Sequence, residues 1–232
     1  LGTLSLLTVD NDLPWQQMPA LEVALLDYAE QMLLVQADGY AALIDEDYPW
    51  GSNGLILNNM LLLGAAYHHA SREPQYLDAV RLGMDYILGR NALNKSFVAG
   101  YGTYPMLHPH HRFWANDPAQ GYPPPPPGAL SGGPNFNPDD PAAVEADLMN
   151  LAPSKRYIDD IESYSTNEVA INWNAPLVFL AGYFNPEAGA SGVGAAPETS
   201  PRDFRLGQNY PNPFNDATVI PFHLESAGEA TL

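Results

Sequence analysis

The sequence predicts a mainly all-α domain that is followed by a flexible linker and the beginning of a β-sandwich. Apolar residues recur with the spacing of a helix in several stretches of residues 1–184. Residues 185–201 are rich in Gly, Ala, Ser and Pro and lack the large apolar side chains that a packed core needs. Residues 219–224 show the side-chain alternation that is typical of a β-strand.

Three helices are expected in the N-terminal part of the chain. Residues 52–71 have few purely polar faces, so this helix should be buried on several sides. Residues 75–88 carry a narrower apolar stripe, and Gly89 is placed to end that helix. Residues 20–36 carry a stripe that consists of Leu21, Ala24, Leu25, Tyr28, Met32 and Val35.

The helical period is absent from residues 89–166, where Gly, Pro, Asn and Tyr dominate. A long irregular segment of this kind is usually functional or disordered, and its aromatic and histidine content favours a functional segment. A last helix is expected to begin near Asn167, with Thr166 as its cap, and to run towards Tyr183. Pro176 should kink this helix or mark a boundary.

The ends of the chain suggest a piece of a longer protein. A single strand cannot form a domain, so residues 202–232 are interpreted as the start of a truncated β-sandwich. Residues 1–7 have neither a basic flank nor a small-residue cleavage site after them, as a signal segment would. Because the chain also begins without methionine, we expect a fragment or a processed product.

Charge and composition exclude several classes of function. The formal net charge is −18, whereas binding nucleic acid requires clustered Lys and Arg, so nucleic acid is not an expected partner. The chain has no cysteine, which excludes disulfides, thiolate chemistry and Cys-ligated metals. The most apolar stretch, residues 55–66, is too short to cross a bilayer and is interrupted by Asn58, Asn59 and Gly64. A neutral substrate is compatible with all of these features.

The candidate chemistry lies in residues 157–168, where carboxylates stand beside aromatic residues. Hydrolysis of a glycosidic bond needs one carboxylic acid that protonates the leaving oxygen and a second carboxylate that activates water on the other sugar face. The alternative is a solvated acidic loop that caps a helix, because helix N-termini favour negative charge. The same preference would oppose a protonated Glu168 in a first helical turn, so burial against Tyr164 or Trp173 and neighbouring carboxylates should offset it.

Two longer runs resemble the signatures of family-nine glycoside hydrolases. Residues 96–112 are similar to the first signature, including its His-x-Arg ending at His110 and Arg112, but depart from it at Ala99 and Tyr104. Residues 48–53, 85–91 and 130–135 resemble further family segments in the family's order, so the resemblance covers roughly residues 15–184. Residues 157–175 are similar to the second signature throughout, with these residues in register: Asp159, Tyr164, Glu168, Ala170, Asn174 and Ala175.

This resemblance implies an (α/α)6 barrel of six outer and six inner helices with an open sugar-binding cleft, most of which would lie upstream. It implies inverting hydrolysis of internal β-1,4-glucosidic bonds in cellulose or related β-glucans by an endoglucanase-type cellulase. Glu168 would be the general acid, with His110 and Asp159 as the other signature active-site residues. Arg112 would hydrogen-bond sugar hydroxyls. The alternatives are that His110 is a packed loop histidine and that Asp159 orients the loop or helps to hold a cation.

Aromatic residues are predicted to bind the sugar, because pyranose rings present apolar C–H faces to aromatic planes. Trp50 is the preferred subsite platform, and Tyr164 and Trp173 are predicted as further substrate-binding residues. Residues 123–127 form a proline run that we interpret as a stiff loop rather than as a ligand of a signalling domain. Other loop aromatics either bind sugar or fill the core: Tyr101, Tyr104, Phe113, Trp114 and Tyr122.

No catalytic base is assigned. In this family the base comes from an Asp-x-x-Asp type motif near the start of the catalytic domain. The nearby aspartate pairs, Asp10 with Asp12 and Asp45 with Asp47, lack that context. We therefore expect that this polypeptide does not hydrolyse cellulose by itself. The alternatives are a non-catalytic carbohydrate-binding remnant and a structural fragment of a helical barrel.

Residues 204–215 resemble the beginning of a type-nine secretion sorting domain, which carries bacterial enzymes across the outer membrane. This resemblance implies a secreted or cell-surface location, with the bacterial secretion machinery as a partner beside the β-glucan substrate. The expected chemistry requires no cofactor. Structural calcium is suggested by family analogy alone, since the sequence has no spaced acidic loop of the EF-hand kind.

Overall fold

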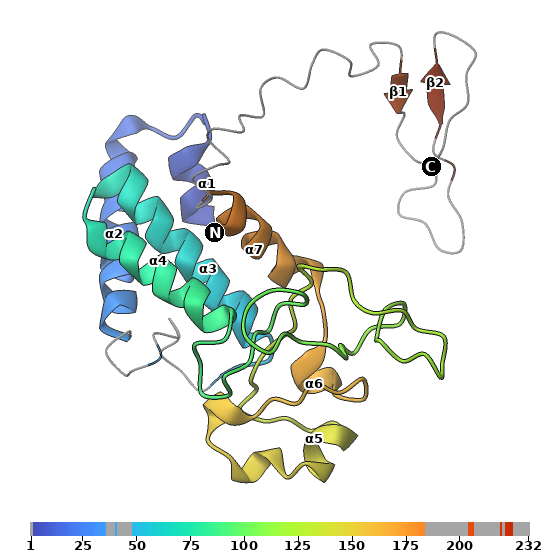
Figure 1. Ribbon diagram of the computed structural model, residues 1–232. Helices are drawn as coiled ribbons and strands as arrows, with labels where there is room; N and C mark the ends of the chain where they lie inside the picture. Colours follow the sequence, from blue (N-terminus) through green and yellow to red (C-terminus); the bar gives the residue numbers. More distant parts are fainter. Residues whose placement is uncertain are drawn as a thin grey trace. The chain divides into compact units, whose positions relative to one another are not determined.

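Three long helices, α2, α3 and α4, pack against one another to form the core (Figure 1). The computed structural model describes residues 2–35, 40, 48–183, 204–206, 219 and 221–224. The chain divides into two compact units, Leu1–Gly182 and Tyr183–Leu232. Among the described helices, none is long and apolar enough to cross a membrane.

Helix α2 spans Met18–Val35, which confirms the helix predicted for residues 20–36. Its buried residues are Leu25, Ala29 and Met32, and their spacing of four and three places them on one stripe that faces the other helices. A short helix, α1 (Gly2–Thr8), and a single 3₁₀ turn, η1 (Trp15–Gln17), precede it. Helix α1 is too short for its apolar residues to show a recurring helical spacing, so it was not predicted.

Helix α3 spans Ser52–Ala65 and continues into a π-helical turn, η3, at Ala66–Ala70. It is buried on nearly every side, as predicted from its shortage of polar faces. Its buried polar residues bind the loop that follows residue 130: Ser52 Oγ donates to the Pro134 carbonyl at 2.7 Å, and Asn53 Nδ2 donates to the Ser131 carbonyl at 2.9 Å. The start of α3 is thereby fixed to a segment 78–82 residues away in sequence.

Helix α4 spans Pro74–Ile87 and confirms the third predicted helix. Proline is favoured at its first position, where the missing N–H costs no helical hydrogen bond. The helix ends one residue after its buried Tyr86, and Gly89 then adopts a φ of 127°, which explains why glycine stands there.

The predicted irregular segment contains short helices and isolated bridges rather than long elements. The bridges join distant residues, such as Val98 with Leu130 and Ser131 with Val169. A helix of four or five residues is too short to show a recurring apolar pattern, so the sequence could not predict it. Those helices and 3₁₀ turns are α5 (Pro141–Glu145), η4 (Leu148–Asn150), η5 (Pro153–Lys155) and α6 (Tyr164–Asn167).

The prediction of one helix that begins near Asn167 is wrong. Helix α6 ends at Asn167, Glu168 is extended with φ −62° and ψ 155°, and α7 begins at Ile171 and runs to Tyr183. The interruption occurs because neighbouring loops bind this backbone: His110 N–H donates to the Asn167 carbonyl, and Gly132 N–H donates to the Glu168 carbonyl. Glu168 is therefore not in the first turn of a helix. Pro176 is not a boundary either, since α7 continues past it.

The described residues of the second unit include two antiparallel strands, β1 (Phe204–Leu206) and β2 (Phe222–Leu224), in which Arg205 pairs with His223. Strand β2 lies within the predicted strand at residues 219–224, whereas β1 was not predicted as a strand. The predicted linker at residues 185–201 lies outside the described residues. A complete β-sandwich stays a prediction.

Candidate active site

Glu168 lies beside three aromatic side chains that come from separate segments. Trp50, just before α3, donates from Nε1 to Glu168 Oε2 at 3.2 Å. The Trp50 ring stacks on Tyr164, with centroids 6.0 Å apart and planes 23° apart. The His110 ring meets the Tyr164 ring edge-on, with centroids 6.0 Å apart. Because Trp50 is 47% exposed, an aromatic surface next to the carboxylate is open to a ligand.

The backbone holds Glu168 between two loops. On one side it forms a parallel bridge with His110, whose N–H donates to the Asn167 carbonyl at 2.9 Å. On the other side Gly132 N–H donates to the Glu168 carbonyl at 2.8 Å. These bonds place the predicted acid and the predicted active-site histidine on adjacent strands of chain.

Asn167, which sequence reasoning did not single out, is the buried centre of this arrangement. Its Nδ2 donates to the His108 carbonyl at 2.7 Å, and its Oδ1 accepts from the Tyr157 hydroxyl at 2.6 Å. Burial, and then the charge of Asp159, raise the pKa of Tyr157 well above its ordinary value. The Tyr157 hydroxyl therefore stays protonated and keeps donating to Asn167.

Asp159 uses its carboxylate to hold the loop that leads to His110. Its two oxygens accept from the backbone N–H groups of Leu107 and His108, each at 2.8 Å. Lys95 Nζ lies 2.9 Å from Oδ2, and Asn167 Nδ2 lies 3.3 Å from Oδ1. Four donors match the four lone pairs of a carboxylate, which favours the loop-orienting alternative for Asp159.

The contacts of Asp159 also test whether this carboxylate fits a calcium site. The Lys95 ammonium already stands where a cation would approach Asp159. No group of three or more His, Asp or Glu side chains in the described part of the chain could hold a metal ion. These residues do not fit a calcium site, and no step of the chemistry is derived through one.

A polar hollow of about 210 Å³ adjoins His110. His110 Nδ1 lies 2.5 Å from the Ile161 carbonyl, which can only accept, so Nδ1 carries the hydrogen and Nε2 is left to face other groups. The predicted residues His110 and Arg112 both line this hollow, as does Tyr122. Glu162 also lines it and belongs to the candidate segment 157–168, although it was not singled out there. Gln120 lines it as well and was not predicted, because nothing in its spacing distinguishes it from a surface residue.

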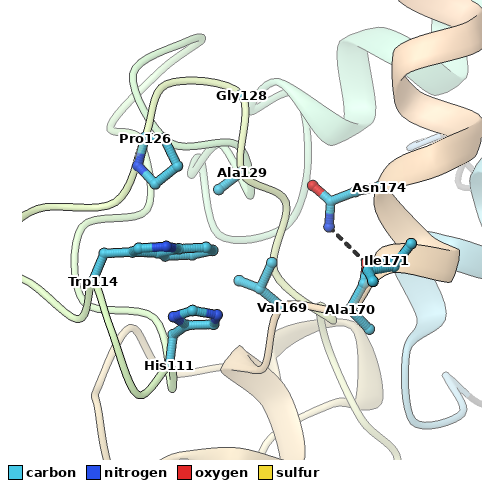
Figure 2. A pocket seen from close by; sticks show the side chains of 9 residues that line it. All are labelled: His111, Trp114, Pro126, Gly128, Ala129, Val169, Ala170, Ile171 and Asn174. Carbon is cyan, nitrogen blue, oxygen red and sulfur yellow. Dashed lines mark hydrogen bonds between the residues drawn. The ribbon is translucent and has the colours of Figure 1, made fainter. Parts of the chain in front are cut away.

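A second hollow, of about 330 Å³, is mostly apolar and lies between the loop at 111–129 and the start of α7 (Figure 2). The rings of His111 and Trp114 stack with centroids 3.5 Å apart. Figure 2 shows one face of the Trp114 ring against His111, with Pro126 on the side of the other face. Trp114 therefore forms part of the wall of the hollow, and sugar binding by it stays a prediction.

Trp173 packs against the backbone of three glycines. A Cβ at Gly51, Gly54 or Gly132 would meet its ring at 2.5, 2.3 or 3.1 Å. This half-buried ring fixes α7 to the start of α3, and substrate binding by Trp173 stays a prediction. Tyr101, Tyr104 and Phe113 are exposed and line neither hollow.

Two pairs of aspartates were considered for the base. Asp10 and Asp12 are exposed next to α1, and the pair Asp45 and Asp47 lies outside the described residues.

The structure is similar to solved endoglucanases of glycoside hydrolase family 9. One of them, endoglucanase J30, aligns with a TM-score of 0.69 and 30% identity over 77% of this chain and 33% of its own. A second, AaCel9A in complex with cellobiose-like isofagomine, aligns with a TM-score of 0.68 and 31% identity over 77% of this chain and 34% of its own. Fold and site together place the chain among the helical glycoside hydrolases.

Sequence relatives narrow this class. The chain is 40% identical to a cellulose 1,4-β-cellobiosidase of Acetivibrio thermocellus over 80% of its length and 36% identical to endoglucanase C of Cellulomonas fimi over 85%. It covers 21% and 18% of these two relatives. Residues 13–181 match the model of glycosyl hydrolase family 9, and the chain belongs to this family.

Proposed function

We propose that this chain provides the general-acid side of an active site that hydrolyses β-1,4-glucosidic bonds, with inversion, in cellulose or related β-glucans. The observation that carries the proposal is the hydrogen bond from Trp50 Nε1 to Glu168 beside His110. The names of the relatives support the substrate class, since they include a cellobiosidase, endoglucanases and a xyloglucan-specific endo-β-1,4-glucanase of Bacteroides ovatus.

Glu168 acts by protonating the oxygen of the leaving sugar as the C–O bond breaks. Trp50 occupies Oε2, so that the acidic proton is carried on Oε1 and the carboxyl group has one defined orientation. A water molecule attacks the anomeric carbon from the opposite face and loses its proton to the base. The product therefore has the inverted anomeric configuration.

The groups around Glu168 suit a glucan chain. The exposed face of Trp50 can cover the C–H face of a pyranose ring. The polar hollow provides the Arg112 guanidinium as a donor and the His110 Nε2 as an acceptor for hydroxyl groups at the rim of a neighbouring sugar. No cofactor takes part in this mechanism.

The base is proposed to come from a part of the family domain that this chain does not span. It should lie roughly 6.5–9.5 Å from Glu168 to leave room for the attacking water. The chain covers about a third of the solved family-nine chains that it matches, namely 33% of endoglucanase J30. A site without its base would bind sugar without turning it over, as the carbohydrate-binding remnant would.

The experiment introduces Glu168→Gln into the full-length protein and compares it with the unchanged full-length protein on two substrates. Hydrolysis of cellotetraose should fall by about 10²–10⁴-fold, because its sugar leaving group needs a proton. Hydrolysis of 2,4-dinitrophenyl β-cellobioside should change little, since dinitrophenolate leaves without one. An equal loss on both substrates would remove the acid assignment.

Binding separates the two candidate functions. Titration calorimetry with cellotetraose is performed on this chain and on the full-length protein. Binding with turnover by the full-length protein supports the hydrolase, binding without turnover supports the remnant, and no binding by either protein rejects both.

We also propose that the C-terminal residues direct export across the bacterial outer membrane. The proposal is supported by the resemblance of residues 204–215 to the beginning of a type-nine sorting domain, within which β1 lies. Its test compares the chain with a version that ends at residue 201 in a bacterium that has this secretion machinery. Equal amounts of both proteins in the medium would reject it.

A further inference from the structure

Asp140 is a fully buried carboxylate that the proposed mechanism does not use. It accepts from the backbone N–H of Ala143 at 2.7 Å and so caps α5. It also accepts from the Ser163 hydroxyl at 2.9 Å, from the Ser165 N–H at 3.0 Å and from the Ser165 hydroxyl. All four of these donors are neutral, so this buried negative charge is satisfied by hydrogen bonds alone.

Most of these bonds do not serve α5. A helix of five residues needs one bond from its cap, whereas the other three bonds of Asp140 go to the turn that begins α6. Ser163 extends the contact to Thr166, whose hydroxyl lies 2.7 Å from its own. The Asp140 carboxylate therefore holds, through hydrogen bonds, the segment that leads directly to Glu168.

The turn that Asp140 binds contains Tyr164. Ser163 and Ser165 flank this residue on both sides, and their side chains are buried while the Tyr164 ring reaches the site. Tyr164 is the ring on which Trp50 stacks and which His110 meets edge-on. A displacement of the turn would move Tyr164 and, with it, the two side chains that border Glu168.

We propose that Asp140 is a positioning residue for the candidate active site, which sets Tyr164 and through it the Trp50 hydrogen bond to Glu168. Only an ionised carboxylate accepts from four donors at once, and hydrogen bonds to a charged acceptor are stronger than neutral ones. An asparagine in its place would turn an NH₂ group towards N–H or O–H donors. The catalytic consequence of the proposal rests on the proposed function, but its structural claim does not.

The experiment follows the indole N–H signals of the chain after labelling tryptophan with ¹⁵N. The chain has four tryptophans, Trp15, Trp50, Trp114 and Trp173, and therefore four such signals. Asp140→Asn should shift the Trp50 signal and leave that of Trp114, whose ring stacks on His111. Loss of the Trp50 signal in Trp50→Phe assigns it.

Two further variants serve as a control and as an independent test. Asp139→Asn, which changes an exposed neighbouring carboxylate, should leave all four signals in place. Ser163→Ala removes one bond to the turn and retains the cap of α5, so it should shift the Trp50 signal in the same direction by less. This variant decides the matter if Asp140→Asn fails to fold. An unmoved Trp50 signal in every folded variant at Asp140 and Ser163 would overturn the proposal.

Kinetics on the full-length protein separate this proposal from the proposed function. Asp140→Asn should lower kcat for cellotetraose more than it raises KM, since Glu168 is misoriented while the polar hollow stays intact. A shifted Trp50 signal in a protein that never hydrolyses glucans would reject the proposed function and support the positioning role. Unchanged kcat in an active protein would overturn the catalytic consequence.

Discussion

Replacement of Gly54 by alanine tests the close packing between α3 and Trp173. Gly54 lies in the first turn of α3, and a Cβ there would stand 2.3 Å from Trp173 Cδ1 and 2.8 Å from Cγ. Carbon atoms prefer separations of about 3.5–4.0 Å, so the ring would have to move. It cannot move easily, because the backbones of Gly51 and Gly132 close on the same ring.

Two opposing terms set the size of the effect. Alanine is more favourable than glycine in a helix by about 1 kcal/mol. Overpacking of a rigid, enclosed site costs up to about 3 kcal/mol. The free energy of unfolding should therefore fall by about 2 kcal/mol, which corresponds to a decrease in Tm of roughly 4–8 °C for a chain of this size.

Gly64→Ala provides the matched control in the same helix. A Cβ at Gly64 meets nothing within 4 Å, so only the helix term remains and stability should rise by about 1 kcal/mol. Urea unfolding followed by tryptophan fluorescence measures both variants. The reasoning is refuted if Gly54→Ala matches or exceeds the stability of the unchanged chain, or if the two variants shift in the same direction.

Two further changes test the ion pair and the histidine stack. Lys95→Met should lower stability by about 1–3 kcal/mol, because it leaves the largely buried Asp159 carboxylate with one donor fewer. Arg81→Met, which breaks an exposed ion pair, should cost under about 1 kcal/mol, and equal losses in urea unfolding would contradict this account. Burial, and then His110, lower the pKa of His111 from its ordinary value of 6.5, so the unfolded chain binds more protons as the pH falls through that value. The stability that neutral His111 provides is thus present above pH 6.5 and lost below it. Urea unfolding at about pH 7.5 and at about pH 5 measures this loss of stability, which should be smaller in His111→Gln than in the unchanged chain.

The long helices could be predicted from the sequence because local pattern and burial agree there. In α2 the apolar stripe that repeats along the sequence is the stripe that the fold buries. In α4 the starting proline and the terminal glycine are also local signals. The break between α6 and α7 could not be predicted, because the groups that bind its backbone, His110 and Gly132, lie far away in sequence.

The candidate site could be predicted only in part. Glu168 and His110 were reached through the family resemblance and Trp50 through the stacking of sugars on aromatic rings, and the structure brings them together. The donors to Asp140 and Asp159 could not be foreseen, because tertiary contacts supply all but the helix cap. For Trp173 a signal did exist: glycines at positions 51 and 54, three residues apart at a helix start, indicate that a bulky partner approaches the backbone.

The extended backbone at Glu168 and Val169 makes the site sensitive to the length of the chain. Successive side chains of an extended segment point to opposite sides, so Glu168 faces Trp50 while Val169 enters the apolar hollow shown in Figure 2. Deletion or insertion of a single residue between α6 and α7 would exchange these two sides. The carboxylate would then enter the apolar hollow and a valine would face Trp50, so this short stretch cannot vary in length as a surface loop can.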